Sequence, residues 1–299
     1  MSGKRRVYIS APYESVLDEK NGQLKNAILK YLETQGMEPQ HFLESGIPAG
    51  WGWNFAAAND VMGRCHGAVI LAFPRWRFTI GDTNYAMATE YNHFEGALAS
   101  AYRLPLLILA DRRVAERGIV WTGGGIPITF IPEDAGPEWL ESPTFTHRFG
   151  IWKRDVSERK DVFLGYCSKA KPVAQEIYIF LTNVLKISVH DWAMDFHSGG
   201  TILEEIERAE GLCTCGIFLF SADDPLEAPS ADRAAPRDNV VFEAGYFVNA
   251  KGKERTLIIR EDGAKMPADL GGNIFLRLGT DRNVAVLHEQ LRRFLDERL

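Results

Sequence analysis

One stretch near the C-terminal end of the chain combines residue types that could do chemistry. It reads APRDNVVFEAGYF and contains Arg237, Asn239 and Glu243. Glu243 stands inside an apolar run, where a bare carboxylate costs several kcal/mol or takes up a proton. Asn239 and Glu243 are four residues apart and share one face of a helix. Glu243 therefore lies either on a solvent-facing helix edge or in the wall of a pocket.

A carboxylate fixed in a semi-apolar cleft suits the cleavage of a bond from ribose C1′ to a good leaving group. The transition state resembles an oxocarbenium ion, and one carboxylate stabilises that cation and orients the ribose hydroxyls. The nicotinamide of NAD is already cationic, so it leaves without a general acid. No metal is needed, and the sequence has no cluster of metal ligands. The bland alternative is an N-capped helix, with Asp238 or Asn239 as its cap, and an ion pair inside the domain.

The elements that position these residues follow from alternating apolar patterns. The continuous runs GAVILAF, LPLLILA and CGIFLFS are typical of buried parallel strands, and helix-length segments separate them. This alternation predicts an α/β protein with two tandem flavodoxin- or Rossmann-like domains, each with a mainly parallel sheet covered by helices. We expect domains at residues 1–147 and 160–299, joined by a charged linker at 148–159.

The two halves of the sequence resemble each other. DVMGRCHGAVILAF in the first half matches EIERAEGLCTCGIFLFS in the second as helix, turn and buried strand. Glu95 follows Phe94 as Glu243 follows Phe242, on the helix after the central strand. Chance periodicity of two α/β domains remains the alternative to an internal repeat.

Composition excludes several classes of protein. The 299 residues carry a net charge of −6 without a long basic run, so direct nucleic-acid binding is not expected. No apolar stretch is long enough to span a membrane, and the N-terminus has no signal core, so we expect a cytoplasmic protein. The four cysteines form no zinc-ligand spacing, and buried thiols in a reducing compartment are the simplest interpretation.

The C-terminal half resembles the TIR-like nucleotide-binding domain of bacterial anti-phage effectors, including those fused to STING or to cyclic-nucleotide sensors. The resemblance rests on DVFLGYCS, GGTILEEIERA, GIFLFSADD and APRDNVVFEAGYF, within residues 160–280. It implies a flavodoxin-like fold and cleavage of NAD to nicotinamide and ADP-ribose products by oligomers. NAD is then a substrate, and no cofactor is implied. The catalytic residue that it implies is Glu243. The substrate-binding residues that it implies are Gly165, Ser168, Trp192, Asp224, Arg237, Asp238 and Asn239.

The N-terminal half is similar to nucleoside 2-deoxyribosyltransferase-like domains. The start YISAPY and the helix TEYNHFEGALA carry this resemblance, which places Glu95 where that family has its catalytic glutamate. The N-terminal pocket that it implies contains Ser10, Tyr13, Glu90 and Glu95. We expect this half to be a sensor that binds a nucleotide-like ligand.

Two aromatic clusters in the first half leave their role open. GWGWNF and FPRWRF place Trp51, Trp53, Trp76 and Phe78 close to Arg75 and Arg77. Such residues could stack on a base and pair with a phosphate. They could equally pack in the core or form a surface for self-association.

Three functions therefore compete. The first is an NAD-cleaving defence effector that works through Glu243 after activation by a nucleotide-type ligand or a partner protein, as a homo-oligomer. The second is a nucleoside or nucleotide N-glycosidase or deoxyribosyltransferase that works through Glu95. The third is a non-catalytic nucleotide-binding adaptor of the TIR type.

Overall fold

The chain folds into two compact units. The computed structural model describes residues 4–41, 55–195, 201–226, 234–272 and 275–299. Within them, the N-terminal unit is Lys4–Arg159 and the C-terminal unit is Lys160–Leu299. Trp51 and Trp53, which the sequence placed in an aromatic cluster, lie outside the described residues.

The N-terminal unit is built on a five-stranded parallel sheet in the order β2-β1-β3-β6-β7. A separate antiparallel hairpin follows the third strand of that sheet. The strands are β1 (Arg5–Ser10), β2 (Met37–His41), β3 (Gly67–Ala72), β4 (Trp76–Ile80), β5 (Thr83–Met87), β6 (Leu106–Asp111) and β7 (Ile128–Ile131). The helices are α1 (Glu19–Thr34), α2 (Phe55–Gly63), α3 (Glu90–Ala101) and α4 (Pro143–Glu158).

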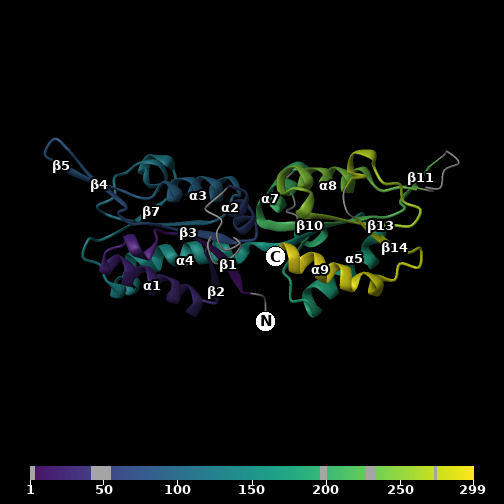
Figure 1. Cartoon of the computed structure of the whole chain (residues 1–299). Coiled ribbons are helices and arrows are strands. Elements are labelled where there is room, and N and C mark those ends of the chain that lie inside the picture. Colours follow the sequence, from purple (N-terminus) through teal and green to yellow (C-terminus); the bar gives the residue numbers. More distant parts are fainter. Residues whose placement is uncertain (1–3, 42–54, 196–200, 227–233, 273–274) are drawn as a thin grey trace. The chain divides into compact units, whose positions relative to one another are not determined.

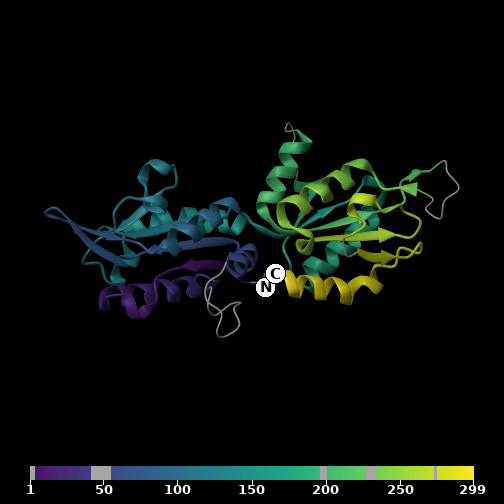
Figure 2. The ribbon, with the colours of Figure 1, turned by 45° about the horizontal axis from the view of Figure 1, so that its top comes forward.

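The helices of this unit cover both faces of its sheet (Figures 1 and 2). Helices α1 and α4 contribute to one buried apolar cluster with the sheet, and α2 and α3 contribute to another. Every residue of β3 is buried, as its uninterrupted apolar sequence predicts.

The predicted linker at 148–159 is wrong, because most of this segment belongs to α4. Helix α4 begins at Pro143 after the cap Ser142, whose hydroxyl accepts from the Phe145 amide. Its buried side chains Phe149, Trp152 and Val156 pack in the core of the N-terminal unit. Charged residues between these positions hide the apolar stripe in the sequence.

The C-terminal unit repeats this plan with a parallel sheet in the order β14-β13-β10-β8-β9. The strands are β8 (Lys160–Gly165), β9 (Val189–Asp191), β10 (Cys213–Phe220), β11 (Asp224–Pro225), β12 (Ala234–Ala235), β13 (Thr256–Glu261) and β14 (Phe275–Leu278). The helices are α5 (Lys171–Ile179), α6 (Trp192–Asp195), α7 (Ile202–Leu212), α8 (Asp238–Lys251) and α9 (His288–Arg298). Helices α7 and α8 lie on one face of the sheet and α5 and α9 on the other (Figure 1).

The predicted fold class is confirmed, since both units are α/β with helix-covered parallel sheets. Their correspondence extends to single residues. Glu95 is the sixth residue of α3 and Glu243 is the sixth residue of α8. Glu95 lies 23 residues beyond Ala72, the end of β3, and Glu243 lies 23 residues beyond Phe220, the end of β10. The two glutamates therefore occupy equivalent places in the two units.

No helix among the described residues has the length and hydropathy that crossing a membrane requires.

Candidate active site

A cavity of about 300 Å³ lies at the carboxyl ends of β8 and β9 in the C-terminal unit. The loop after β8, the start of α7 and the first turns of α8 surround it. Its lining residues are Tyr166, Cys167, Ser168, Trp192, Ile202, Arg237, Asn239, Val240 and Glu243. This edge of a parallel sheet is where ligands bind in open α/β folds.

Glu243 is the buried acid of this cavity. The residue is only 6% exposed. Among the described residues, no group forms a hydrogen bond with its Oε2 atom. Helix α8 holds the residue in place, because Val240, Ala244 and Phe247 bury the helix face against the sheet. The helix thus fixes the carboxyl group in position, while its Oε2 atom has no hydrogen-bond partner in the described part of the chain.

Gly165, the last residue of β8, makes room for this carboxyl group. A Cβ atom at this position would lie 2.9 Å from Glu243 Oε2 and 2.6 Å from Phe218 Cδ1. Both distances are shorter than real Cβ contacts, so a larger residue would displace the carboxyl group or the ring. Gly165 does not line the cavity itself but sits directly behind its acid.

Burial raises the pKa of Glu243 from 4.5 to about 8. At neutral pH Glu243 is therefore mainly protonated. A cation placed opposite Glu243, or hydroxyl groups that donate to it, would favour the carboxylate and lower this pKa. The site can thus exchange a proton for a positively charged ligand.

Aromatic and thiol groups form the wall next to Glu243. The Tyr166 hydroxyl donates to Asp191 Oδ1 at 2.9 Å, and its ring meets that of Trp192 edge-on with centroids 5.7 Å apart. Cys167 Sγ lies 3.5 Å from Ser221 Oγ, which in turn donates to Asp223. Burial raises the pKa of the Cys167 thiol, so it does not act as a thiolate nucleophile at neutral pH.

Charged groups lie at the rim of the cavity. Arg237 is the N-cap residue of α8, and its guanidinium is 3.4 Å from Asp224 Oδ2. Lys169 Nζ donates to the carbonyl oxygen of Asp223 at 2.9 Å and is 3.9 Å from Asp224 Oδ1. These three side chains are about half exposed, so the ion pairs are weak and open to exchange with a ligand.

The structure brings together five of the residues that the sequence proposed for this site. They are Ser168, Trp192, Arg237, Asn239 and Glu243. Asp238 does not line the cavity. The expected cap at Asp238 or Asn239 is wrong, because Arg237 occupies the N-cap position without a side-chain cap bond. Asp224 is not among the lining residues of the cavity, but it pairs with Arg237, which is.

Sequence reasoning missed Tyr166, Cys167, Ile202 and Val240. Tyr166 and Cys167 directly follow Gly165, so their position after the end of β8 could have marked them as candidate site residues. Ile202 and Val240 are apolar residues in helices, and their pattern does not distinguish a cavity wall from a packed core. Among the described residues, no group of three or more potential metal ligands comes together.

The N-terminal unit has a cavity of about 590 Å³ at the corresponding edge of its sheet. Glu95, which is 5% exposed, contributes to its wall, and the Tyr8 hydroxyl donates to Glu95 Oε1 at 2.8 Å. Burial and the neighbouring carboxylate raise the pKa of Tyr8, which keeps this hydroxyl a donor. Tyr13 also lines the cavity.

The other two residues proposed for the N-terminal pocket lie elsewhere. Ser10 is buried, and its hydroxyl accepts from Asn92 Nδ2 at 2.8 Å. Glu90 is exposed and accepts from the Trp76 indole at 3.1 Å. Placing Ser10 and Glu90 in the pocket wall was therefore wrong, because each has a partner outside it.

Known proteins resemble the C-terminal unit. CD-NTase-associated protein 12 from Lachnospiraceae bacterium (strain RUG226) is 33% identical over 112 residues, which is 37% of this chain and 35% of that protein. Pycsar effector protein BcPycTIR from Burkholderia cepacia is 38% identical over 72 residues, which is 23% of this chain and 24% of that protein. The matches thus span about a third or less of the relatives' length.

A solved structure of the TIR domain of the Toll-related receptor TRR-2 from Hydra magnipapillata is similar with a TM-score of 0.34. It is 15% identical and covers 46% of this chain and 98% of that domain. The family described as "CAP12/Pycsar effector protein, TIR domain" matches residues 161–280, the region that contains the cavity around Glu243. Residues 161–280 are therefore a TIR domain of the CAP12/Pycsar effector family.

Proposed function

We propose that the C-terminal unit is an NAD glycohydrolase that uses Glu243. The observation that carries this proposal is a buried carboxyl group that lines a cavity at the carboxyl edge of a parallel sheet, with no internal partner for Oε2 among the described residues. A structural carboxylate at such a depth would be paired or hydrogen-bonded. One that is held in place without a partner is suited to a ligand.

The reaction breaks the bond between the nicotinamide nitrogen and ribose C1′. The bonding electrons go to the pyridinium ring, which leaves as neutral nicotinamide, while positive charge develops on the ribose. The carboxylate of Glu243 stabilises this charge and accepts hydrogen bonds from ribose hydroxyls. Water then adds to C1′ and releases a proton, so NAD⁺ and water give nicotinamide, ADP-ribose and H⁺.

The resting protonation of Glu243 fits this chemistry. A pKa of about 8 keeps the empty site mainly neutral, and the positive nicotinamide ring would favour the charged form when it binds. Arg237 and Asn239 border the same cavity, and in this proposal they contact other parts of the dinucleotide. The electrostatic stabilisation would then arise only with the substrate in place.

We further infer that the protein is an activated defence effector. The relatives are named as CD-NTase-associated and Pycsar effector proteins, which supports activation by a cyclic nucleotide. In this proposal the N-terminal unit is the sensor and the C-terminal unit is the effector, and cleavage takes place in an oligomer.

The test is to incubate the full chain with NAD and a panel of cyclic nucleotides, and to measure nicotinamide by chromatography. We expect release by the natural sequence with at least one activator, no release by Glu243→Gln, and release by the matched variant Glu95→Gln. Unchanged cleavage by Glu243→Gln would refute the role of this residue. Oligomers formed with an activator while NAD stays intact would instead support the non-catalytic adaptor.

The cavity of the N-terminal unit supports a second candidate function, the binding or cleavage of a nucleoside. Its described wall includes the carboxylates of Glu14, Glu33 and Glu95 beside the single lysine Lys25. This excess of acids favours a neutral hydroxyl-bearing nucleoside over a phosphate-bearing ligand, so in this second candidate the cavity does not hold the cyclic nucleotide. Loss of nucleoside turnover in Glu95→Gln, with turnover kept in Glu243→Gln, would assign an N-glycosidase or deoxyribosyltransferase to this unit. Saturable binding of a nucleoside without turnover would assign a sensor.

A further inference from the structure

The hairpin β4–β5 of the N-terminal unit presents an apolar face to solvent. Side chains alternate between the two faces of a strand, so Trp76, Phe78 and Ile80 share one face. The cross-strand partner of Phe78 is Tyr85, whose ring stacks on it with centroids 5.7 Å apart. The exposed fractions are 49% for Trp76, 39% for Phe78, 64% for Ile80 and 39% for Tyr85. The predicted alternative of core packing is therefore wrong for Trp76 and Phe78.

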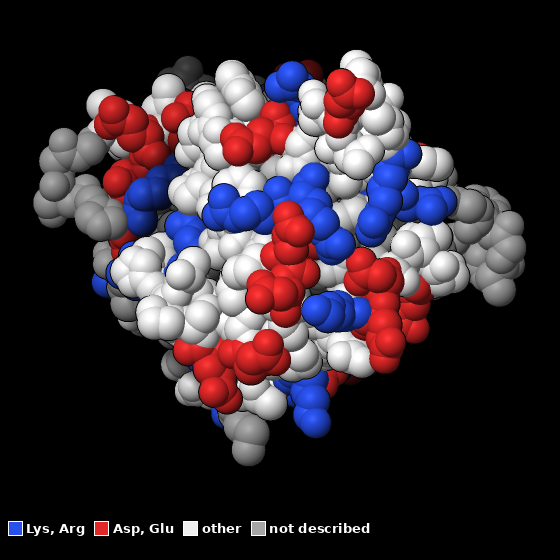
Figure 3. Space-filling model, turned by 90° about the vertical axis from the view of Figure 1, so that its left-hand side faces the viewer, with Lys and Arg blue, Asp and Glu red and all other residues white. Residues whose placement is uncertain are grey.

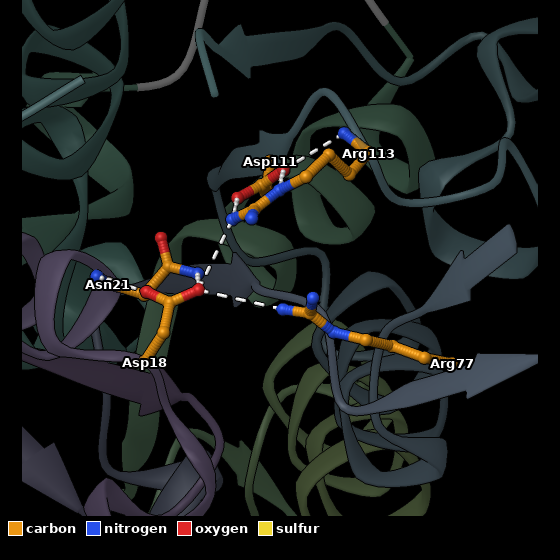
Figure 4. Close-up of polar contacts among 5 residues, drawn as sticks. All are labelled: Asp18, Asn21, Arg77, Asp111 and Arg113. Carbon is orange, nitrogen blue, oxygen red and sulfur yellow. Dashed lines mark hydrogen bonds and ion pairs between the residues drawn. The ribbon is translucent and has the colours of Figure 1, made fainter. Parts of the chain in front are cut away.

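The opposite face of the hairpin is anchored to the unit. Arg77 points to Asp18, the N-cap of α1, with 3.6 Å between the guanidinium and the carboxylate (Figure 4). The same carboxylate contacts Arg113, which also pairs with Asp111 at the end of β6 (Figure 4). The Ala115 amide donates to the carbonyl oxygen of Ala86 at 2.8 Å. A two-stranded hairpin is marginal on its own, and these contacts hold it with its apolar face outward.

The rings of this face are not arranged for stacking on a nucleic-acid base. Phe78 and Tyr85 stack on each other, and the Arg75 guanidinium lies over the Trp76 ring at 4.6 Å. Arg77, which could pair with a phosphate, lies on the opposite face and contacts Asp18. Base stacking needs an open ring face with a cation beside it. The apolar face therefore fits another apolar surface better.

The charges at the two ends of the hairpin are opposite. Arg75 precedes β4 at the base, and Asp82 lies at the tip, in the two-residue turn after Ile80. Gly81 in this turn has a φ of +61°, which favours glycine and keeps the turn tight. Seen from the side where β4 and β5 project, Lys and Arg side chains form a band between groups of Asp and Glu (Figure 3).

We propose that the apolar face of the β4–β5 hairpin packs against the same face of a second copy of this chain. The two hairpins run antiparallel, so that Asp82 of each copy lies against Arg75 of the other. A two-fold contact of this kind pairs the patch with itself, and a parallel arrangement would set like charges together. The opposite charges of Arg75 and Asp82 thus favour a second copy in the antiparallel orientation.

The size of the face sets the strength of this contact. Its four exposed side chains offer on the order of 400 Å² per copy, so two copies bury about 800 Å². A standard stable interface buries roughly 1,200–2,000 Å². We therefore expect weak, concentration-dependent self-association that adds to any contact made elsewhere in an oligomer.

The first experiment is sedimentation of the full chain at rising concentration, up to about 1 mM. We expect reversible dimers for the natural sequence and at least ~10-fold weaker association for Ile80→Glu, because a buried charge replaces a buried apolar group. Thr79→Glu is the matched control, since the adjacent exposed Thr79 lies on the opposite face. A natural sequence that stays monomeric throughout, or equal association of Ile80→Glu and the natural sequence, would overturn the proposal.

A charge-reversal set tests the orientation. Arg75→Asp and Asp82→Arg should each weaken association several-fold, and the double variant Arg75→Asp/Asp82→Arg should restore it, because both cross-copy pairs are rebuilt. A double variant weaker than either single variant would overturn the antiparallel arrangement.

A thiol at the centre of the face adds a direct measurement. The described cysteines are all buried, so Phe78→Cys should cross-link to a second copy on mild oxidation, and Thr79→Cys should not. An oligonucleotide added in a parallel sample tests whether the apolar face binds nucleic acid instead of a second copy. If Ile80→Glu loses oligonucleotide binding while its sedimentation is unchanged, the surface binds nucleic acid and the proposal is overturned.

Discussion

In the N-terminal unit the Tyr8 hydroxyl donates to Glu95 at 2.8 Å, whereas the equivalent fourth residue of β8 is Phe163. The Phe163 ring offers no donor and stacks instead on Phe247, with centroids 5.0 Å apart. At this strand position the glutamate thus has a hydroxyl donor in one unit, and a phenylalanine ring stands at the equivalent place in the other.

The same contrast holds at two further positions. The sixth residue of the first strand is Ser10 in β1 and Gly165 in β8, and the third residue of the helix is Asn92 in α3 and Val240 in α8. Asn92 and Ser10 hydrogen-bond to each other beside Glu95. Their counterparts, Gly165 and Val240, have no side-chain donor or acceptor to offer to Glu243. The shared fold therefore puts a glutamate at the same place in both units. The side chains at the neighbouring positions determine whether its carboxyl group has an internal hydrogen-bond partner.

The largest expected effect separates the two acids by activity. In the activated protein, Glu243→Gln should lower the rate of NAD cleavage by roughly 10³-fold, because the transition-state charge loses its stabilising carboxylate. Glu95→Gln should leave that rate within about twofold. Nicotinamide release under saturating NAD gives both values. Equal losses in the two variants would mean that the two sites act together.

The next effect concerns stability against pH. The pKa of Glu243 is about 8 in the folded chain and 4.5 without burial, so the folded state binds more protons between these values. The free energy of unfolding should therefore fall by a few kcal/mol in total as pH rises from about 5 to 8. Above pH 8 this loss of stability, which is the penalty for the buried charge, should level off. Glu243→Gln should remove this penalty. Urea unfolding of both proteins at pH 5 and pH 9 measures it, and an equal difference at both pH values would contradict the shift.

Gly165→Ala tests the space behind the acid. The added Cβ should push the Glu243 carboxyl group or the Phe218 ring aside, lowering NAD cleavage roughly 10- to 100-fold and stability by about 1–3 kcal/mol. Gly245→Ala is the control, because Gly245 lies in α8, the helix that carries Glu243, and nothing lies within 4 Å of the new Cβ. A rate that is unchanged in both variants would show that this space is not needed.

The smallest effect on NAD cleavage is expected in the N-terminal unit. Tyr8→Phe removes the donor to Glu95 and should destabilise the protein by about 1.5–3 kcal/mol, with NAD cleavage unchanged. Tyr13→Phe, at a residue that is 55% exposed, should change stability by less than about 0.5 kcal/mol. Thermal unfolding compares the two variants. A drop in cleavage by Tyr8→Phe alone would connect the Glu95 site to the catalytic one.

Much of the fold could be predicted from the sequence because buried parallel strands are continuous apolar runs. All but the last residue of GAVILAF forms β3, and all but the last residue of CGIFLFS lies in β10. Glu95 and Glu243, which the sequence pairs, lie at equivalent positions of α3 and α8. Helix α4 was mistaken for a linker because one stripe of four buried residues is diluted by charged neighbours. The local sequence pattern therefore reveals the spacing of apolar residues well, but it reveals which of them are buried poorly when polar residues stand between them.

The site was less predictable than the fold, because contacts between distant residues leave no local trace. Tyr8 and Glu95 are 87 residues apart, and Ser10 and Asn92 are 82 apart. An isolated Ser10 or Glu90 gives no sign that its hydrogen bonds are already made. Glu243 could be singled out because an acid inside an apolar run is unusual, since burying a carboxylate among apolar residues is costly.

The neutral resting form of Glu243 has a calorimetric consequence. If a cationic ring binds in the cavity, the acid must give up its proton to the solvent. The heat measured by titration at pH 7 should then depend on the ionisation enthalpy of the buffer, with up to one proton released per site. A plot of observed heat against that enthalpy has the number of released protons as its slope. A slope of zero would mean that Glu243 keeps its proton when the ligand binds.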